Sequence, residues 1–489
     1  MDYNDTWAPT AKQSSVRTVL SIANAKGWLV KHSDVPSAYL KATLNELIYM
    51  EQPEGFVVPG KETWVCRLLK SLYGLKQAGL EWYNMISTKL IEWGYKRNRV
   101  DKCVFTRHDD SGSQVSMLAL HVDDSLFGIK DEKEEKRIRD LMMNEYKAEI
   151  EDAHFFCGIR IEHDRTTKRM FLSQEAYIDQ MIEKFSMVDA RIIRTPMDDR
   201  EILTKDMEPT TEEEKEKMRE IPYTSLVGAI MWPATMTRPD ILAAYQTLTK
   251  FNKNPGMKHW NAALRVLKYL KGTKKYGMLL DGCGITFSMG DDGKEIIDQP
   301  IQIYADADYA GDLDDRKSTS GLYVQIAGGM ICARAKKQGC VTLATMEAEL
   351  VALSLAIQHH EEITAFLDEL GFKCREPAII HEDNQSAIAY TRGGKNESKA
   401  RHLGVRFHYI KENVEGGKVK IVYCPTKEML ADIFTKAIPA DQFEYLRNGI
   451  RIVDLPRIFE LRRLGKQELA NSATYRGEWE CENILIESG

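Results

Sequence analysis

The chain has 489 residues, of which 43% are hydrophobic and 29% charged, and its formal net charge is −6. These values are typical of a soluble globular protein with about three domains, and they argue against a protein that coats nucleic acid nonspecifically. No apolar run approaches the roughly 20 residues that span a bilayer, and the first residues do not resemble a signal peptide. The nine cysteines include no C-x-x-C pair. We therefore expect a cytosolic or nuclear chain with no membrane partner, zinc site or disulfide framework.

The first predicted elements place an acid at the end of a strand. Val16–Ala25 is predicted to be a helix, and Trp28–Asp34 is predicted to be a strand that ends on its carboxylate. A second helix is predicted over Gly79–Trp93, because large apolar residues recur there at spacings of three and four. Those residues are Trp82, Ile86, Leu90 and Trp93.

The segment His121-Val-Asp-Asp124 lies between two apolar runs, predicted to be strands over Val115–Val122 and Ser125–Ile129, with a third strand over Cys103–Arg107. A turn between two strands holds both carboxylates at a hairpin tip, where their repulsion favours a bound cation. Mg²⁺ prefers carboxylate oxygens and leaves positions open for phosphate, so this turn is a candidate centre for phosphoryl transfer. An ordinary polar β-turn explains the two aspartates equally well.

The middle of the chain is predicted to be mainly helical. A strand over Phe155–Glu162 precedes a helix with Ser173 as its N-cap, and the charged stretch Asp198–Glu220 is predicted to be a linker or long loop. Thr224–Leu280 is predicted to be helical, and Gly282–Gln299 to be an irregular break.

Residues 241–280 contain no acid. Trp260, Leu267 and Leu270 follow helical spacing, and basic residues lie largely away from that stripe. The resulting cationic face could contact a phosphate backbone, although a solvated basic helix is an equally simple interpretation. The basic residues in question include Lys258, Arg265 and Lys268.

Beyond the break, the pattern predicts a mixed sheet flanked by helices. A long helix is expected over Thr342–Leu370 and a final helix over Glu428–Lys436. The expected strands are Ile301–Ala305, Gly321–Ile326, Met330–Ala335, Ala378–Glu382 and Val419–Tyr423.

Four acids in this region have unusual surroundings. Asp306 and Asp383 each follow a strand, and Asp432 lies among apolar neighbours. Glu349 extends the apolar stripe of the long helix, and burial of a lone carboxylate there costs several kcal/mol unless a cation or hydrogen-bond donors compensate. Convergence of the four would form a two-metal nuclease site, whereas each acid taken singly is explained as a helix cap or a partly exposed residue.

These features, in this order, resemble the reverse transcriptase and RNase H portions of copia-type LTR retrotransposon polyproteins. The resemblance runs from Asp2 to about Leu446 and depends on about a dozen colinear motifs, which together are highly specific. The motifs include Asp34-Val-Pro-Ser-Ala-Tyr39, Ser71-Leu-Tyr-Gly-Leu-Lys-Gln-Ala78, His121-Val-Asp-Asp124, Tyr304-Ala-Asp-Ala-Asp308, Met346-Glu-Ala-Glu349, Asp383-Asn-Gln385 and Ala431-Asp-Ile-Phe-Thr-Lys436.

The resemblance implies a mixed α/β (α+β) architecture in four parts. A right-hand polymerase palm with partial fingers would occupy residues 1–165, and a helical thumb and connection, with the charged linker 198–220, would occupy residues 166–297. An RNase H-like mixed five-stranded sheet flanked by helices would occupy residues 298–440. Residues 441–489 would form a tail of unknown role.

The resemblance also assigns roles at a polymerase site. Asp34, Asp123 and Asp124 would hold two Mg²⁺ ions, with Mn²⁺ as a substitute. Tyr39 would lie beneath the sugar of the incoming deoxynucleoside triphosphate, and Gln77 would contact that nucleotide. The implied contacts to the RNA template and DNA primer are Cys157, Gly158, Lys258, Arg265 and Lys268.

In the second domain, the resemblance makes Asp306, Glu349, Asp383 and Asp432 the metal-binding carboxylates of an RNase H that cuts the RNA strand of an RNA–DNA hybrid. The family implies a cytoplasmic location, within a virus-like particle, or a nuclear one. It leaves the oligomeric state open.

The sequence departs from the family pattern in three ways. His121 stands where the family usually has tyrosine, Pro36 removes a backbone N–H near the expected triphosphate, and the basic fingers segment expected upstream of Asp2 is missing from the sequence. We therefore keep two alternatives open, a ribonuclease-only protein and a nucleic-acid-binding remnant without catalysis.

Overall fold

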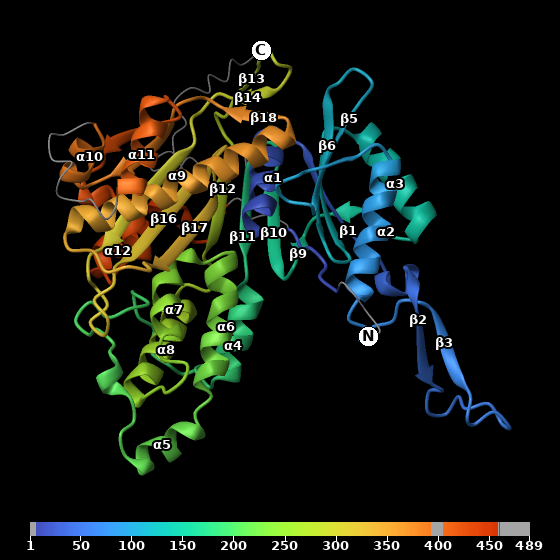
Figure 1. The fold of residues 1–489 in the computed structure, drawn as a ribbon, viewed down its shortest axis with the longest axis horizontal. Coiled ribbons are helices and arrows are strands. Elements are labelled where there is room, and N and C mark those ends of the chain that lie inside the picture. Colours follow the sequence, from blue (N-terminus) through green and yellow to red (C-terminus); the bar gives the residue numbers. More distant parts are fainter. Residues whose placement is uncertain (1–5, 393–403, 458, 460–489) are drawn as a thin grey trace. The chain divides into compact units, whose positions relative to one another are not determined.

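The computed structural model describes residues 6–392, 404–457 and 459 (Figure 1). The chain forms two compact units. Unit 1 contains Met1–Ala23, Trp28–Cys157 and Glu369–Gly371, and unit 2 contains Asn24–Gly27, Gly158–Asp368 and Phe372–Gly489. No helix among the described residues is both long enough and apolar enough to cross a bilayer.

Unit 1 is built around a sheet with the strand order β4-β5-β6-β7-β1-β8. The central strand β6 is buried along almost its whole length, in keeping with its continuous apolar run. The predicted strands and helices of this region are confirmed, with small changes in their ends. The elements are α1 (Gln13–Ala25), β1 (Leu29–Asp34), η1 (Ala38–Lys41), β2 (Thr43–Glu51), β3 (Val65–Lys70), α2 (Ala78–Glu92), β4 (Lys96–Arg97), β5 (Val104–His108), β6 (Gln114–His121), β7 (Asp124–Ile129), α3 (Glu132–Tyr146), β8 (Glu151–Asp152) and β9 (Phe155–Phe156).

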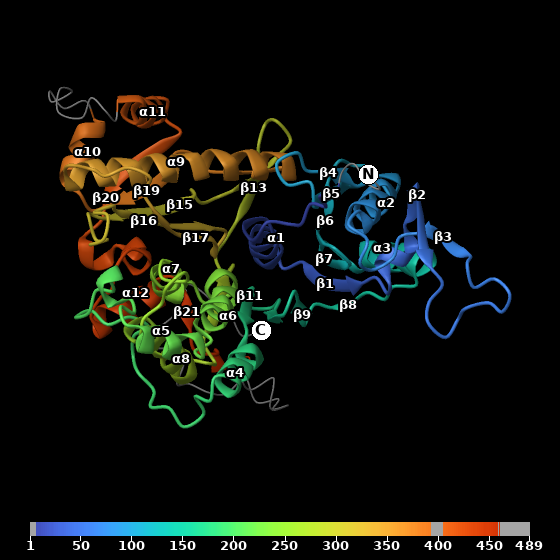
Figure 2. The same cartoon turned by 60° about the horizontal axis from the view of Figure 1, so that its bottom comes forward.

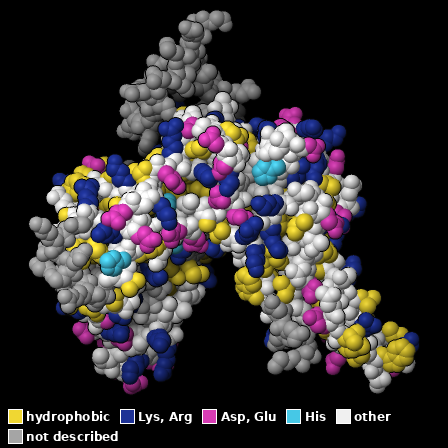
Figure 3. Space-filling view, turned by 45° about the horizontal axis from the view of Figure 1, so that its top comes forward, with side chains coloured by type: hydrophobic (Ala, Val, Ile, Leu, Met, Phe, Trp, Pro, Cys, Tyr) yellow, Lys and Arg dark blue, Asp and Glu magenta, His cyan; other side chains and the backbone are white. Residues whose placement is uncertain are grey.

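The strands β2 and β3 pair only with each other and form a separate two-stranded sheet. Large apolar side chains are exposed on these two strands and on the connection between them. Figure 3 shows apolar side chains gathered at the far end of this hairpin. These side chains include Leu47, Tyr49, Phe56, Trp64 and Leu69.

Unit 2 begins with the strands β10 and β11, which lie beside β12 and β21 in the order β21-β12-β11-β10. Helices follow β11 in the sequence. These elements are β10 (Ile159–Asp164), β11 (Arg169–Ser173), α4 (Glu175–Lys184), η2 (Lys205–Met207), α5 (Glu212–Arg219), α6 (Tyr223–Met236), η3 (Pro239–Ile241), α7 (Leu242–Thr249), α8 (Met257–Gly272) and β12 (Gly277–Asp281).

The second half of unit 2 contains the predicted mixed five-stranded sheet, in the order β17-β16-β15-β19-β20. The strand β15 is antiparallel to β16 and parallel to β19, and β19 is parallel to β20. Figure 2 shows α9 running along one face of this sheet. The elements are β13 (Phe287–Met289), β14 (Glu295–Ile297), β15 (Gln302–Asp308), β16 (Thr319–Ile326), β17 (Gly329–Lys337), α9 (Thr345–Leu370), β18 (Phe372–Cys374), β19 (Ala378–Glu382), α10 (Gln385–Thr391), α11 (Gly404–Glu415), β20 (Val419–Tyr423), η5 (Thr426–Glu428), η6 (Leu430–Phe434), α12 (Ala440–Gly449) and β21 (Ile452–Val453).

Several predicted boundaries are wrong. The strand predicted over Phe155–Glu162 is interrupted, because Cys157 and Gly158 both have positive φ, which is incompatible with an extended strand. Ser173 is the last residue of β11, and the N-cap of α4 is Gln174. Residues 277–281 form a strand because they pair with β11 and β21.

The secondary structure of three further segments differs from the prediction. The predicted linker 198–220 contains α5, which begins at a capping box formed by Thr211 and Glu214. The predicted break 282–299 contains β13 and β14, and the predicted final helix is the short 3-10 helix η6.

The expected domain boundaries differ from the compact units. The boundary predicted after residue 165 falls within the β10–β11 hairpin, whereas the units separate after Cys157. The described part of the predicted tail, residues 441–457 and 459, includes most of α12 and all of β21, and Leu446, Ile450 and Ile452 are fully buried.

Candidate active sites

The backbone of unit 1 brings the first three predicted acids together. Asp34 is the last residue of β1 and lies directly opposite Asp124, the first residue of β7. The N–H of Val35 donates to the carbonyl of Asp123 over 3.2 Å. The antiparallel register therefore fixes all three aspartates at one end of two neighbouring central strands.

The turn that carries Asp123 has an unusual backbone conformation. Val122 has φ of 58°, and a β-branched residue rarely adopts this left-handed region because its Cβ clashes with the backbone. The indole N–H of the buried Trp82 on α2 donates to the carbonyl of Val122 over 2.6 Å. This hydrogen bond fixes the turn to α2.

The three aspartates interact electrostatically. Burial, and then the charges of Asp123 and Asp124, raise the pKa of Asp34. Nε2 of His32 lies 2.9 Å from Oδ1 of Asp124. Repelling carboxylates with hard oxygen donors fit a divalent cation chemically. Within the described residues, however, this trio is not among the groups whose potential ligand atoms all lie within 4.8 Å of one another.

The predicted nucleotide-binding residues differ in accessibility. Tyr39 is partly buried, and burial and the charge of Asp123 raise its pKa; its ring centroid lies 4.8 Å from that of Tyr73. Gln77 stands at the N-cap of α2 and is only 2% exposed, so its side chain offers little surface to a nucleotide.

The predicted primer-binding pair stands where the two units divide. Burial, followed by the charges of Asp124 and Asp123, raises the pKa of the Cys157 thiol to about 12. Gly158 belongs to unit 2, where a Cβ at this position would lie 3.7 Å from Nε1 of Trp232.

Unit 2 holds a second and tighter acidic cluster. Asp306 lies on β15, Glu349 lies on α9 and Asp383 follows β19, and one carboxylate oxygen from each lies within 4.8 Å of the other two. Asp306 and Glu349 are each only 3% exposed. The parallel pairing of β15 with β19 and the packing of α9 therefore bring together residues that are far apart in the sequence.

The fourth predicted acid reaches this cluster through a close backbone approach. Gly321 on β16 is paired with Asp306, and a Cβ on this glycine would lie 2.6 Å from the carbonyl oxygen of Ala431 in η6. The hydroxyl of Thr435 donates to Oδ2 of Asp306 over 2.6 Å. The absence of a side chain at Gly321 therefore allows η6, with Asp432, to lie against the sheet.

Electrostatics indicate that this cluster needs positive charge. Burial, followed by the charges of Glu382, Asp306 and Asp383, raises the pKa of Glu349 to about 11. Burial and the charge of Asp306 raise the pKa of Asp432 to about 8, although Lys436 opposes the shift. Oε2 of Glu349 is buried without a hydrogen-bond partner. A buried, unpartnered carboxylate oxygen among other carboxylates fits a hard divalent cation.

Three charged residues near this cluster have no role predicted from the sequence. Glu382 is fully buried, and burial and the charges of Asp383 and Asp306 raise its pKa well above the usual range. Burial also raises the pKa of Asp308. Nζ of Lys436 lies 2.9 Å from Oδ1 of Asp432 and 4.0 Å from Oδ2 of Asp306. Asp308 lies two residues after Asp306, and Lys436 lies four residues after Asp432, each within the same motif as that acid. This spacing could have indicated from the sequence that both residues belong to the site.

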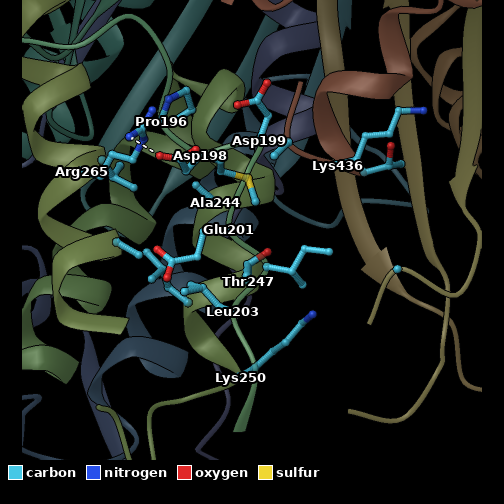
Figure 4. Close-up of a pocket in the computed structure, with 18 of the residues that line it drawn as sticks. Pro196, Asp198, Asp199, Glu201, Leu203, Ala244, Thr247, Lys250, Arg265 and Lys436 are labelled. Carbon is cyan, nitrogen blue, oxygen red and sulfur yellow. Dashed lines mark hydrogen bonds and ion pairs between the residues drawn. The ribbon is translucent and has the colours of Figure 1, made fainter. Parts of the chain in front are cut away.

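Two of the three cations predicted to contact phosphates have acidic partners in unit 2. Lys258 pairs with Glu201 at 2.9 Å, and Arg265 pairs with Asp198 at 3.0 Å. Both acids come from the segment predicted to be a linker. Lys268 lines a cavity of about 450 Å³, which Asp198, Arg265 and Lys436 also line (Figure 4).

Comparison with known proteins finds a matching family model and several relatives. Residues 1–199 match the family model of the reverse transcriptase (RNA-dependent DNA polymerase). The Retrovirus-related Pol polyprotein from transposon TNT 1-94 of Nicotiana tabacum is 36% identical over 445 residues, which cover 91% of this chain and 32% of that protein. The corresponding polyprotein from transposon RE2 of Arabidopsis thaliana is 32% identical and covers 93% of this chain and 30% of its own length.

A solved structure of the foamy viral protease-reverse transcriptase in complex with RNA/DNA hybrid aligns with 85% of this chain and 46% of its own chain, at 14% identity and a TM-score of 0.43. The chain spans about a third of the length of the curated relatives it matches. Residues 1–199 therefore match the reverse transcriptase (RNA-dependent DNA polymerase) family model, in a chain that is similar over 91% of its length to a copia-type retrotransposon Pol polyprotein.

Proposed function

We propose that this chain is an RNA-directed DNA polymerase that also hydrolyses the RNA strand of RNA–DNA hybrids. Unit 1 would carry polymerisation at Asp34, Asp123 and Asp124, and unit 2 would carry hydrolysis at Asp306, Glu349, Asp383 and Asp432. The observation that supports the second activity best is the buried, unpartnered Oε2 of Glu349 beside two other carboxylates.

Two Mg²⁺ ions per site are the proposed cofactors. When bound, such ions lower the pKa of a coordinated hydroxyl or water and neutralise the charge that develops on a reacting phosphate. Mn²⁺ has the same preference for oxygen ligands and would substitute.

At the first site, the three aspartates would hold the 3′-hydroxyl of a DNA primer in line with the α-phosphate of a deoxynucleoside triphosphate. Tyr39 is partly buried and interacts with Asp123, so its ring can limit the room available to a 2′-hydroxyl. The hydrogen bond from Trp82 to Val122 would keep Asp123 in place during this reaction.

At the second site, the four carboxylates would position a water against a phosphodiester of the RNA strand. Burial of Asp306 and Glu349 limits solvent access on the protein side, so the attacking water would be one held by the site. Selection of the RNA strand would follow from the shape of the hybrid and its 2′-hydroxyl groups.

Matched variants of the full chain test both activities. Primer extension on an RNA template and cleavage of the RNA in a labelled hybrid would be measured with Mg²⁺ for the parent chain, Asp123→Asn and Asp306→Asn. We expect Asp123→Asn to lose extension alone and Asp306→Asn to lose cleavage alone.

Two outcomes would replace this proposal by one of the alternatives. Cleavage without extension in the parent chain would favour the ribonuclease-only protein, in line with the tighter clustering of the acids in unit 2. Binding of the hybrid without either reaction would favour a noncatalytic module.

A further inference from the structure

Lys436 lies at the second site, where its ammonium group contacts two of the predicted metal-binding carboxylates. Its Nζ lies 2.9 Å from Oδ1 of Asp432 and 4.0 Å from Oδ2 of Asp306, while its side chain keeps 35% of its surface exposed. Among the described residues, the ion pairs of Asp306 and Asp432 both come from this lysine.

The place of the ammonium group divides the carboxylates into two sets. Asp306, Glu349 and Asp383 have oxygens within 4.8 Å of one another and could together ligate a cation. Asp432 is not part of that group, and its ionic contact is with Lys436. Nζ of Lys436 is therefore the positive charge that lies within ion-pair distance of both Asp306 and Asp432.

The surrounding contacts hold the lysine at this place but leave it room to move. Thr435, the preceding residue, donates to Asp306 and fixes the backbone at the end of η6. The side chain of Lys436 lines the cavity of about 450 Å³ with Asp308, Gly311 and Thr319 (Figure 4). The flexible four-carbon stem of a lysine allows its ammonium to swing away from a carboxylate pair.

We infer that Lys436 is an intrinsic counter-cation of the second site, which occupies the place of one divalent ion between Asp306 and Asp432 until that ion displaces it. The inference rests on the proposed nuclease function. It makes Lys436 a positioning residue that sets the affinity of the site for its second cation, and the displaced ammonium would face a substrate phosphate from the cavity.

Mn²⁺ binding, measured without substrate, tests the inference. Calorimetric and paramagnetic titrations would use the full chain with Asp123→Asn and Asp124→Asn in every sample, so that the first site does not contribute. Lys436→Met would be compared with Lys436→Arg, which keeps the charge. The matched control is Lys250→Met, because Lys250 lines the same cavity but pairs with Asp312 at 2.9 Å.

We expect the parent to bind one Mn²⁺ tightly and a second weakly, and Lys436→Met to bind the second at least about tenfold more tightly, because a competing charge is gone. Lys436→Arg and Lys250→Met should resemble the parent. Lys436→Gln, measured in parallel, should behave as Lys436→Met does and replaces it if the methionine variant is unfolded by circular dichroism.

The failures are distinguishable. Equal affinity of the parent and both neutral variants for the second Mn²⁺ would overturn the role of Lys436 and leave the nuclease proposal standing. Absence of any Mn²⁺ binding to the parent at this site, checked against Glu349→Gln, would overturn the nuclease proposal, and the inference with it.

Discussion

Asp34 and Asp124 stand directly opposite each other on the antiparallel strands β1 and β7. Like charges in such a cross-strand pair destabilise a sheet, so the backbone register itself maintains an unfavourable contact. A cation bound between the strands would remove this repulsion.

Asp124→Asn should stabilise the cation-free protein by about 0.2–1 kcal/mol, because it removes the opposed charge. The same change should lower primer extension at least about 100-fold, since one carboxylate of the proposed site is lost. Urea unfolding with a chelator and steady-state extension with Mg²⁺ measure the two effects. Asp140→Asn, on the exposed face of α3, is the charge-matched control. Extension at the parental rate would exclude Asp124 from the site.

Glu349 should make the stability of the protein depend on pH. Its pKa is raised to about 11 from a usual value of 4.5, so the folded protein retains a proton that the unfolded chain loses. The resulting stabilisation is complete below the unfolded pKa and is lost as the pH rises through the folded pKa.

Glu349→Gln should therefore reduce the fall in unfolding free energy between about pH 6 and about pH 9, measured by urea unfolding with a chelator. Asp432, whose pKa is raised to about 8, would contribute to the remaining slope in the same direction, together with Glu382 and Asp308, whose pKa values are also raised. Identical slopes for the parent and the variant would contradict the electrostatic description of the site.

Val122→Gly should relieve the strain of the left-handed turn. Glycine adopts positive φ without a steric penalty, and strain of this kind costs on the order of 1–3 kcal/mol, so the variant should be more stable despite its more flexible unfolded chain. We expect the gain in urea unfolding to be accompanied by slower extension, because Asp123 becomes less firmly held. A loss of stability would show that Val122 is not strained.

Asp198→Asn combined with Glu201→Gln should free Arg265 and Lys258 from their ion pairs. If these cations then reach phosphates, affinity for an RNA–DNA hybrid should rise and the dependence of log affinity on log salt should steepen by roughly 0.7–0.9 for each new contact. Fluorescence anisotropy at several salt concentrations measures both quantities. Asp206→Asn combined with Glu213→Gln, at exposed positions within the same segment, removes the same total charge as a control. An effect no larger than that of the control would show that Lys258 and Arg265 form ion pairs within the protein and do not contact nucleic acid.

The sequence predicted elements whose apolar pattern is local and strong. The strands β6 and β7 and the helices α2 and α9 could be predicted because runs and three-to-four spacings report directly on burial. Placement of Asp34 at the end of a strand followed from the same pattern.

Features that depend on distant partners could not be predicted in this way. The partners of Lys258 and Arg265 lie 57 and 67 residues away, in a segment without apolar periodicity. Glu382 is fully buried on the same face of β19 as Ala378 and Ile380, so the two-residue alternation of this strand was its only signal in the sequence. The interruption at Cys157 and Gly158 required backbone angles that no side-chain pattern reveals.

The pairing of β21 with β12 has a consequence for how this protein can be divided. Met278 is paired with Ile452, and the N–H of Leu279 donates to the carbonyl of Arg451 over 3.0 Å. A gene product that stops after residue 440 would expose the backbone of β12 to solvent and to other chains, which favours intermolecular association. Unit 2 should thus be expressed with residues 441–453 attached, even when only its ribonuclease chemistry is of interest.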